Sequence, residues 1–246
     1  MDKRIDKIQN LFNERNCITW VDTYPDSQSP DELKRFEWFA KNTKLNLSKS
    51  SFFEIGVGSG TFYEFVKRKG IKEYLGSEPN KQMVERFEKY FPNQSEFIKE
   101  NDALSVLKES NKKFDCIHIS HVLEHLERDY FIDLFEAMVE KLNIDGEIWI
   151  STPCAETIIA SAQRYYDMTH RTSFVFENFV NLAQLYNLQV IAKSGKLIAI
   201  ENFKDIVRFT HEIILYWLNR ILFAFAIGTR KKCGVFSSEI SVILKK

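Results

Sequence analysis

The sequence contains little glycine, proline or cysteine for its length. Nine Gly and five Pro in 246 residues disfavour all-β folds, which are built on many tight turns. The four cysteines are widely dispersed and form no Cys-x-x-Cys pair, so they indicate neither a disulfide scaffold nor a zinc site. We therefore predict a reducing, cytoplasmic compartment. The opening stretch MDKRIDKIQN lacks an apolar core, so we expect no signal peptide.

A net charge of either sign is also absent. The 34 Lys and Arg residues balance 34 Asp and Glu residues, which gives a formal net charge of zero at pH 7. Nucleic-acid-binding proteins usually carry a basic excess or stripe, so this balance argues against a nucleic-acid partner. The composition, 44% hydrophobic and 28% charged, is that of a globular protein. A chain of this length buries enough surface to fold without disulfides or metals.

From residue 51 onward, short apolar runs alternate with segments of helical spacing. Seven runs predict strands: Phe52–Ile55, Glu73–Gly76, Glu96–Lys99, Phe114–Ser120, Glu147–Ser151, Leu188–Lys193 and Ser238–Lys245. The helical segments between the first five are Thr61–Lys69, Asn80–Tyr90, Ala103–Glu109 and Asp129–Leu142. Strict alternation of strand and helix predicts a parallel sheet with helices on both faces. The sequence therefore predicts an α/β, Rossmann-like domain with additions.

The two ends of the chain depart from this alternation. Residues 1–49 predict a separate helical or lid segment, in which Ser29-Pro30-Asp31-Glu32 has the pattern of a capping box. We expect the sheet domain over residues 50–200, a helical insertion over 201–234 and the final strand over 235–246.

The longest apolar run lies near the C-terminus, at Ile213–Ile227. A helix of this length spans roughly 22 Å, short of the ~30 Å hydrocarbon core, so we predict no transmembrane span. The alternatives are a buried helix, a homodimer interface and a lid over a ligand pocket. Arg230-Lys231-Lys232 follow directly, which leaves contact with a membrane surface open as well.

A glycine-rich loop, Gly56-Val57-Gly58-Ser59-Gly60, ends the first predicted strand. Glycines there let main-chain N–H groups approach a ligand at the positive end of a helix. The loop departs from the dinucleotide-binding fingerprint, because Thr61 stands where that pattern has its last glycine. No Lys-Ser/Thr follows, so a phosphate-binding P-loop is excluded too. Alone, the loop could also be a simple turn.

Acidic residues follow the next two predicted strands. Glu78 could accept hydrogen bonds from two vicinal ribose hydroxyls, or it could be a solvated residue that opens the next helix. Asp102, which precedes Ala103, could accept a hydrogen bond from an adenine amino group or cap the helix that follows. Because the carboxyl ends of parallel strands share one edge of a sheet, we expect these acids and the glycine loop to share a ligand.

These motifs, with the run Ser120-His121-Val122-Leu123-Glu124-His125-Leu126 after the fourth strand, resemble class I S-adenosylmethionine-dependent methyltransferases. The resemblance covers about residues 50–195 and the final strand, and the run is similar to the small-molecule branch. It implies a seven-stranded sheet with an antiparallel last strand. It also implies S-adenosylmethionine as cofactor and S-adenosylhomocysteine as product. The residues that it implies for cofactor binding are Glu54, Gly56, Gly58, Gly60, Glu78, Asp102, Ala103 and Ser120.

Histidines mark the candidate acceptor side. His118 alternates with Cys116 and Ser120 in a predicted strand, and we expect a satisfied interior residue. His121 and His125 lie four residues apart, so on a helix they would share one face. We consider His121 an acceptor contact or a base. His125 is an acceptor contact or a structural residue beside the cofactor.

A polar loop after the fifth strand carries the remaining candidates. Asp167 and His170 predict a catalytic base with a carboxylate that fixes its tautomer. Arg164 and Arg171 could clamp a phosphate, with Tyr166 beside them in contact with substrate. The alternative is a solvated loop that is anchored by its charged residues.

The Asp-x-Thr-His element at residues 167–170 resembles one common in methyltransferases of bacterial surface-polysaccharide clusters. We therefore predict O-methylation of a small-molecule acceptor in capsule or lipopolysaccharide synthesis: a sugar, a sugar nucleotide or a nucleotide-linked phosphorus group. A quinone-precursor or other O- or N-methyltransferase and an inactive methyltransferase-like binding subunit are the alternatives. The predicted base is His170, with His121 second. The spacing of these residues with Asp167 does not demand a metal, so we predict none.

Overall fold

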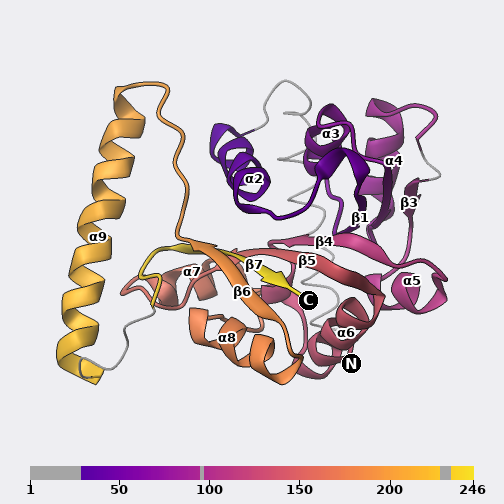
Figure 1. The fold of residues 1–246 in the computed structure, drawn as a ribbon. Helices are drawn as coiled ribbons and strands as arrows, with labels where there is room; N and C mark the ends of the chain where they lie inside the picture. The colour runs from indigo at the N-terminus through magenta and orange to yellow at the C-terminus, as the bar shows by residue number, and fades with distance from the viewer. Residues whose placement is uncertain (1–28, 95–96, 228–233) are drawn as a thin grey trace.

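The computed structural model describes residues 29–94, 97–227 and 234–246. Seven strands of these residues form one sheet, in the order β3-β2-β1-β4-β5-β7-β6 (Figure 1). The strands are β1 (Ser51–Ile55), β2 (Glu73–Ser77), β3 (Ile98–Lys99), β4 (Phe114–Ser120), β5 (Leu142–Pro153), β6 (Gln189–Ser194) and β7 (Glu239–Lys245). β7 runs antiparallel to both neighbours, whereas β1 to β5 pair in parallel. The predicted fold class is confirmed.

Helices cover both faces of this sheet. They are α2 (Pro30–Asn42), α3 (Thr61–Arg68), α4 (Lys81–Tyr90), α5 (Ala103–Glu109), α6 (Arg128–Lys141), α7 (Ala160–Tyr166), α8 (Phe176–Leu185) and α9 (Phe203–Ile227), with the 3₁₀ turns η1 (Leu47–Lys49) and η3 (Leu123–His125). α2, α3 and α4 pack on one face, and α5, α6 and α8 pack on the other (Figure 1).

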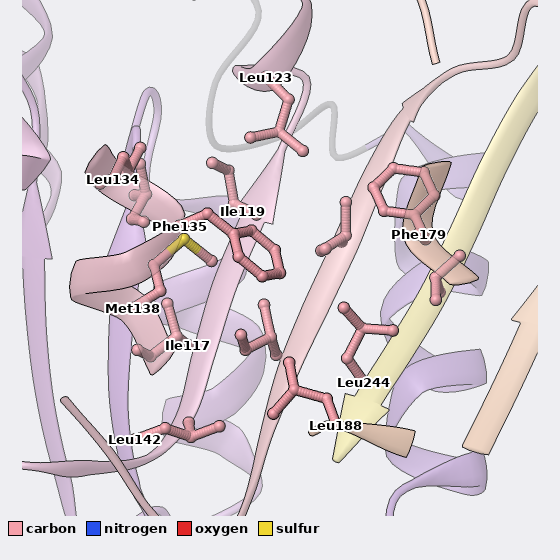
Figure 2. Close-up of a cluster of buried hydrophobic side chains, with 14 of the residues drawn as sticks. Ile117, Ile119, Leu123, Leu134, Phe135, Met138, Leu142, Phe179, Leu188 and Leu244 are labelled. Atoms are coloured by element: carbon pink, nitrogen blue, oxygen red, sulfur yellow. The ribbon is translucent and has the colours of Figure 1, made fainter. Parts of the chain in front are cut away.

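The two faces bury cores of different composition. On the α6 and α8 face the core is mainly aliphatic, and Figure 2 shows Ile117 and Ile119 of β4 pointing into it. On the opposite face the core is aromatic, and the ring of Phe39 in α2 stacks on Trp149 of β5 at 5.1 Å. Because successive side chains of a strand point to opposite faces, each central strand contributes to both cores.

α2 is tied to the sheet domain by the side chains of its first turn. The predicted capping box is wrong, because the Ser29 side chain makes no capping hydrogen bond. The Glu32 carboxylate instead accepts a hydrogen bond from Thr61 Oγ1 at 3.0 Å, and Asp31 accepts one from the Ala199 main chain at 2.8 Å. These contacts reach residues distant in sequence, which a local capping pattern cannot reveal.

The fifth strand begins earlier than predicted. It covers Leu142–Pro153 and not only Glu147–Ser151, because Leu142 already pairs with Phe114 of β4 before an irregularity in the register. The extension has exposed residues at 144 and 145, so it lacks the apolar run on which the sequence prediction relied.

α9 runs along the outside of the molecule (Figure 1). A buried helix, one of the predicted alternatives, is therefore wrong: Phe203 is 77% exposed and Phe225 is 87% exposed. The helix is anchored by Asn219, which is fully buried and donates hydrogen bonds to Thr157 Oγ1 and to the carbonyl oxygen of Phe236. No helix in the described part of the chain is long and apolar enough to cross a membrane.

Candidate functional site

The glycine loop lies at the carboxyl end of β1, between β2 and β4. Gly56, Gly58 and Gly60 have φ angles of +75°, +54° and +82°, in the left-handed region that favours glycine. The main-chain N–H of Gly56 donates to the carbonyl oxygen of Ser77 at 2.9 Å. No heavy atom of the described residues beyond its chain neighbours lies within 4 Å of the position that a Gly58 Cβ would take. A ligand can therefore approach the main chain closely at Gly58.

Glu78 fixes this loop from the end of β2. Its carboxylate, which is 8% exposed, accepts hydrogen bonds from the main-chain N–H groups of Gly58 at 2.9 Å and Asn80 at 3.0 Å. Burial raises the pKa of Glu78, while these two hydrogen bonds act to lower it. Each carboxylate oxygen retains a further lone pair, so Glu78 can also accept hydrogen bonds from hydroxyls of a ligand.

Two buried hydroxyls lie at the ends of the strands that flank β1. Neither Ser77 Oγ, on β2, nor Ser120 Oγ, on β4, has a hydrogen-bond partner among the described residues. Buried hydroxyls in proteins are normally hydrogen-bonded. Their position on both sides of the glycine loop fits a polar ligand that lies across the carboxyl end of β1.

Glu54 lies beneath the loop, in the aromatic core. It accepts a hydrogen bond from the Tyr74 hydroxyl, and its Oε1 lies 3.4 Å from His118 Nδ1. Burial raises the pKa of Glu54 well above its ordinary value and lowers the pKa of His118 well below its own. His118 is interior as predicted, but its expected hydrogen bonding is wrong. Its ring stacks on Phe62 at 3.7 Å, and neither ring nitrogen has a hydrogen-bond partner in the described residues.

Asp102 caps α5, one of the two roles that the sequence left open. Its carboxylate accepts hydrogen bonds from the main-chain N–H of Ser105 at 3.1 Å, from Ser105 Oγ at 2.6 Å and from the Tyr130 hydroxyl at 2.8 Å. Burial would raise the pKa of Asp102, but these hydrogen bonds lower it. Ala103 begins the helix and is buried in the aliphatic core.

The turn after β4 places His121 between two carboxylates. His121 has a φ of +53°, and its Nδ1 lies 3.4 Å from Glu124 Oε1 while its Nε2 lies 3.5 Å from Glu239 Oε2. Desolvation lowers the pKa of His121, whose side chain is still 41% exposed, but the two carboxylates outweigh it and raise that pKa to about 9. Arg35, 3.1 Å from Glu239, adds a second positive charge. Arg35 Nη1 also lies 3.2 Å from His121 Nε2, so charged side chains of both signs contact this ring.

His125 and His170 lie together, although 44 residues separate them. Their rings meet edge to face with centroids 4.8 Å apart. His125 Nδ1 lies 2.7 Å from Thr169 Oγ1, which donates its hydrogen to Asp167 Oδ1, also at 2.7 Å. Asp167 Oδ2 is 3.9 Å from His170 Nε2, beyond hydrogen-bond distance. Asp167 therefore orients His125 through Thr169, and it does not form the predicted hydrogen-bonded pair with His170.

Main-chain hydrogen bonds join the turns that carry these two histidines. The carbonyl oxygen of Glu124 accepts from the N–H groups of Arg171 at 2.7 Å and Thr172 at 3.1 Å. The Glu124 carboxylate is 2% exposed, and its Oε2 accepts from Thr152 Oγ1 at 3.1 Å. Sequence analysis missed Glu124 as a site residue. Its neighbour His125 was the available signal, but the link to His170 depends on main-chain contacts that side-chain types do not encode.

The predicted phosphate clamp of two arginines is not formed. The Arg171 guanidinium pairs with Glu127. Arg164 Nη2 donates to the carbonyl oxygen of Arg171 at 2.5 Å, while its Nη1 has no hydrogen-bond partner among the described residues. The side chain of Tyr166 lies outside what the structure describes.

Val122 connects the glycine loop to the histidine turn. A Cβ on Gly56 would lie only 2.6 Å from Val122 Cγ2, so the two loops are in direct contact. Val122 directly follows His121 and precedes η3. Ligands of open α/β sheets bind at the carboxyl ends of the strands, where these loops meet. The glycine loop and the turn of His121 and His125 are therefore neighbours at the carboxyl ends of the strands.

Residues 26–193 match a protein family described as a methyltransferase domain. This chain belongs to that family. The predicted class of enzyme, an S-adenosylmethionine-dependent methyltransferase, and its cofactor are confirmed by this membership. Among curated proteins, no sequence matches the chain.

Solved structures of methyltransferases share the fold. A SAM-dependent methyltransferase from Archaeoglobus fulgidus is 21% identical with a TM-score of 0.62, and the match covers 89% of this chain and 95% of that chain. The N-methyltransferase NodS from Bradyrhizobium japonicum, bound to S-adenosylhomocysteine, is 14% identical with a TM-score of 0.57 and 89% coverage of both chains. A SAM-dependent methyltransferase from Mesorhizobium loti is 12% identical with a TM-score of 0.56, covering 89% and 99%. At these identities the likeness shows the fold alone.

Proposed function

We propose that this protein transfers the methyl group of S-adenosylmethionine to a hydroxyl of a small-molecule acceptor. The observation that carries the proposal is the contact of the glycine loop with the histidine turn at Val122. It brings a loop suited to a nucleoside cofactor against Val122, the residue that leads into the turn of His125. The cofactor supplies a methyl group on a sulfonium, which is a good leaving group.

The residues at the carboxyl ends of β1, β2 and β4 fit that cofactor. Gly58 leaves its main chain open to close approach. Glu78 keeps lone pairs for ribose hydroxyls, and Ser77 and Ser120 contribute buried hydroxyls that have no partner among the described residues. The work of these residues is to hold the methyl donor in line with the acceptor and to exclude water.

We infer that the acceptor is a carbohydrate, free or linked to a nucleotide, of the kind used in capsule or lipopolysaccharide synthesis. The Asp167–His170 segment supports this inference, because the element that resembles polysaccharide methyltransferases builds the histidine pair. Arg164 Nη1 supports a phosphate on the acceptor, because it lacks a partner in the described part of the chain. An alcohol is a poor nucleophile, so its proton must be taken up or made easier to lose. The groups available for this lie at His125 and His170.

Replacement of His170 tests this assignment. We expect His170→Ala to lower turnover by about 100-fold or more with little change in cofactor affinity. The assay follows S-adenosylhomocysteine release with a panel of sugars and sugar nucleotides. His211→Ala, on the exposed α9, is the matched control and should retain full turnover. Unchanged turnover of His170→Ala would remove this residue from the reaction. Failure of the wild-type protein to bind S-adenosylmethionine at millimolar concentration would overturn the proposed function itself.

A further inference from the structure

Three side chains from the turn after β4 and the segment after α7 have the composition of a metal site. Glu124, His125 and His170 each offer one ligand atom, and these atoms all lie within 4.8 Å of one another. The set comes from two separate segments, so its assembly depends on the fold and not on sequence spacing. We propose that these residues bind one divalent first-row transition-metal ion.

The positions of the ligands are fixed before any ion binds. The carbonyl oxygen of Glu124 accepts hydrogen bonds from the main-chain N–H groups of Arg171 and Thr172, which hold the segment of His170 against the turn of His125. Glu124 itself is 2% exposed, and one of its carboxylate oxygens is oriented by Thr152. Such preorganisation is what a metal site requires of its surroundings.

The tautomer of His125 is set for coordination through Nε2. The single hydroxyl hydrogen of Thr169 goes to Asp167 Oδ1, so Thr169 Oγ1 can only accept a hydrogen bond from His125 Nδ1. The proton of the neutral ring is therefore on Nδ1, which leaves a lone pair on Nε2. A carboxylate that orients a histidine in this way, here through a hydroxyl, is the usual outer shell of a histidine metal ligand.

The number and type of ligands indicate which ions fit. Two imidazoles and one carboxylate suit zinc, manganese, cobalt or ferrous iron better than calcium or magnesium, which prefer oxygen ligands alone. Three protein ligands also leave coordination positions open, as in sites where a metal binds a reactant. The ion would therefore have room for an oxygen of a small molecule.

The role of the ion in catalysis rests on the proposed function, whereas its binding does not. An acceptor hydroxyl bound at an open position loses its proton more easily, and the proton leaves to solvent. The oxygen then forms the new bond to the methyl carbon, while the carbon–sulfur bond breaks and its electron pair stays on sulfur. His170 would act as a ligand in this scheme, and no imidazole base is needed.

Titration of the full chain with metal ions tests the site. Protein stripped with EDTA and dialysed is titrated with Mn²⁺, Co²⁺ and Zn²⁺ by calorimetry, and visible absorption of the Co²⁺ form reports the coordination number and geometry of the site. We expect one ion per chain, with affinity falling at least about 100-fold in His170→Ala, His125→Ala and Glu124→Gln. Thr169→Val should weaken binding by roughly 10- to 100-fold, because it removes the hydrogen bond that orients His125. His211→Ala should bind as the wild type does.

The outcomes separate this inference from the proposed function. Binding of S-adenosylhomocysteine serves as the check that each variant is folded. If the wild type binds none of the three ions at millimolar concentration, or if folded His170→Ala binds them unchanged, the metal site is wrong. Methyl transfer that persists in EDTA would also contradict the catalytic role while leaving the methyltransferase proposal intact. Tight ion binding without methyl transfer to any acceptor would support the metal site and contradict the proposed function.

Discussion

The candidate site has two halves, a cofactor side with the glycine loop and Glu78 and a histidine side with His125 and His170. These halves are held in place in different ways. On the cofactor side, the glycine loop and Glu78 are held mostly by main-chain groups close to the strands that carry them. On the histidine side, two segments that are distant in sequence are joined by main-chain hydrogen bonds to the Glu124 carbonyl oxygen and by the side-chain contact of Thr169 with His125. The cofactor side is therefore built from the ends of neighbouring strands, whereas the histidine side joins two segments that are distant in sequence. Substitutions should act differently on the two.

The contact between the halves predicts the largest effect on stability. Gly56→Ala forces a side chain into a left-handed position and against Val122, so we expect the free energy of unfolding to fall by about 3 kcal/mol. Gly58→Ala is the matched control: its φ is also positive, but its surroundings are open, and we expect a loss of only about 1 kcal/mol. Urea unfolding measures both. Equal losses would mean that Val122 does not connect the halves tightly.

The cofactor side should show a large effect on binding alone. Removal of the carboxylate in Glu78→Ala eliminates the acceptor that we propose for ribose hydroxyls and frees the N–H of Gly58. We expect affinity for S-adenosylhomocysteine to fall by about 100-fold, measured by calorimetry. Glu73→Ala, at the opposite end of the same strand, should bind normally. Normal binding by Glu78→Ala would show that the cofactor does not use this carboxylate.

The histidine side should show a pH-dependent effect on stability. Burial would raise the pKa of Glu239, but its hydrogen bond with His121 and the charges of His121 and Arg35 outweigh burial and lower it to about 2 from an ordinary 4.5. A lowered pKa stabilises the fold above the ordinary value, and this stabilisation is lost as the pH falls from about 4.5 to about 2. We expect Glu239→Gln to cost about 2 kcal/mol at pH 7.

Denaturant unfolding of wild type and Glu239→Gln across this pH range provides the measurement. The two proteins should approach each other in stability toward pH 2 to 3. A difference that stays constant from pH 7 to pH 3 would show that the ion pair with Arg35 does not stabilise the fold.

The smallest expected effect concerns Asp102, and it distinguishes a carboxylate that caps a helix from one that binds the cofactor. In Asp102→Asn, the cap of α5 and the hydrogen bond from Tyr130 are weakened, and we expect a loss of about 1 kcal/mol at pH 7. Because the pKa of Asp102 is lowered, this loss should shrink as the pH falls below 3.8. Cofactor affinity, measured in the same preparation, should change less than in Glu78→Ala. A larger change would assign Asp102 to the adenine.

The same division explains what the sequence could predict. The strands, the glycine loop and Glu78 follow from apolar runs, glycines and an acid at strand ends, all features that are local in sequence, whereas the antiparallel last strand is expected only from the family resemblance. The pairing of His125 with His170 does not, because it depends on a main-chain contact across a 44-residue separation. Likewise, the sequence left Asp102 between two roles, and Ser105 and Tyr130 had to be seen beside it to decide.

The attachment of the Arg171–Thr172 segment to the Glu124 carbonyl has a consequence for natural variation. A peptide N–H is present in every residue except proline, so the attachment does not depend on which side chains stand at these two positions. The side chains at 171 and 172 can therefore change while the histidine pair keeps its geometry. A loop that is attached through its main chain can exchange these side chains and still keep its position.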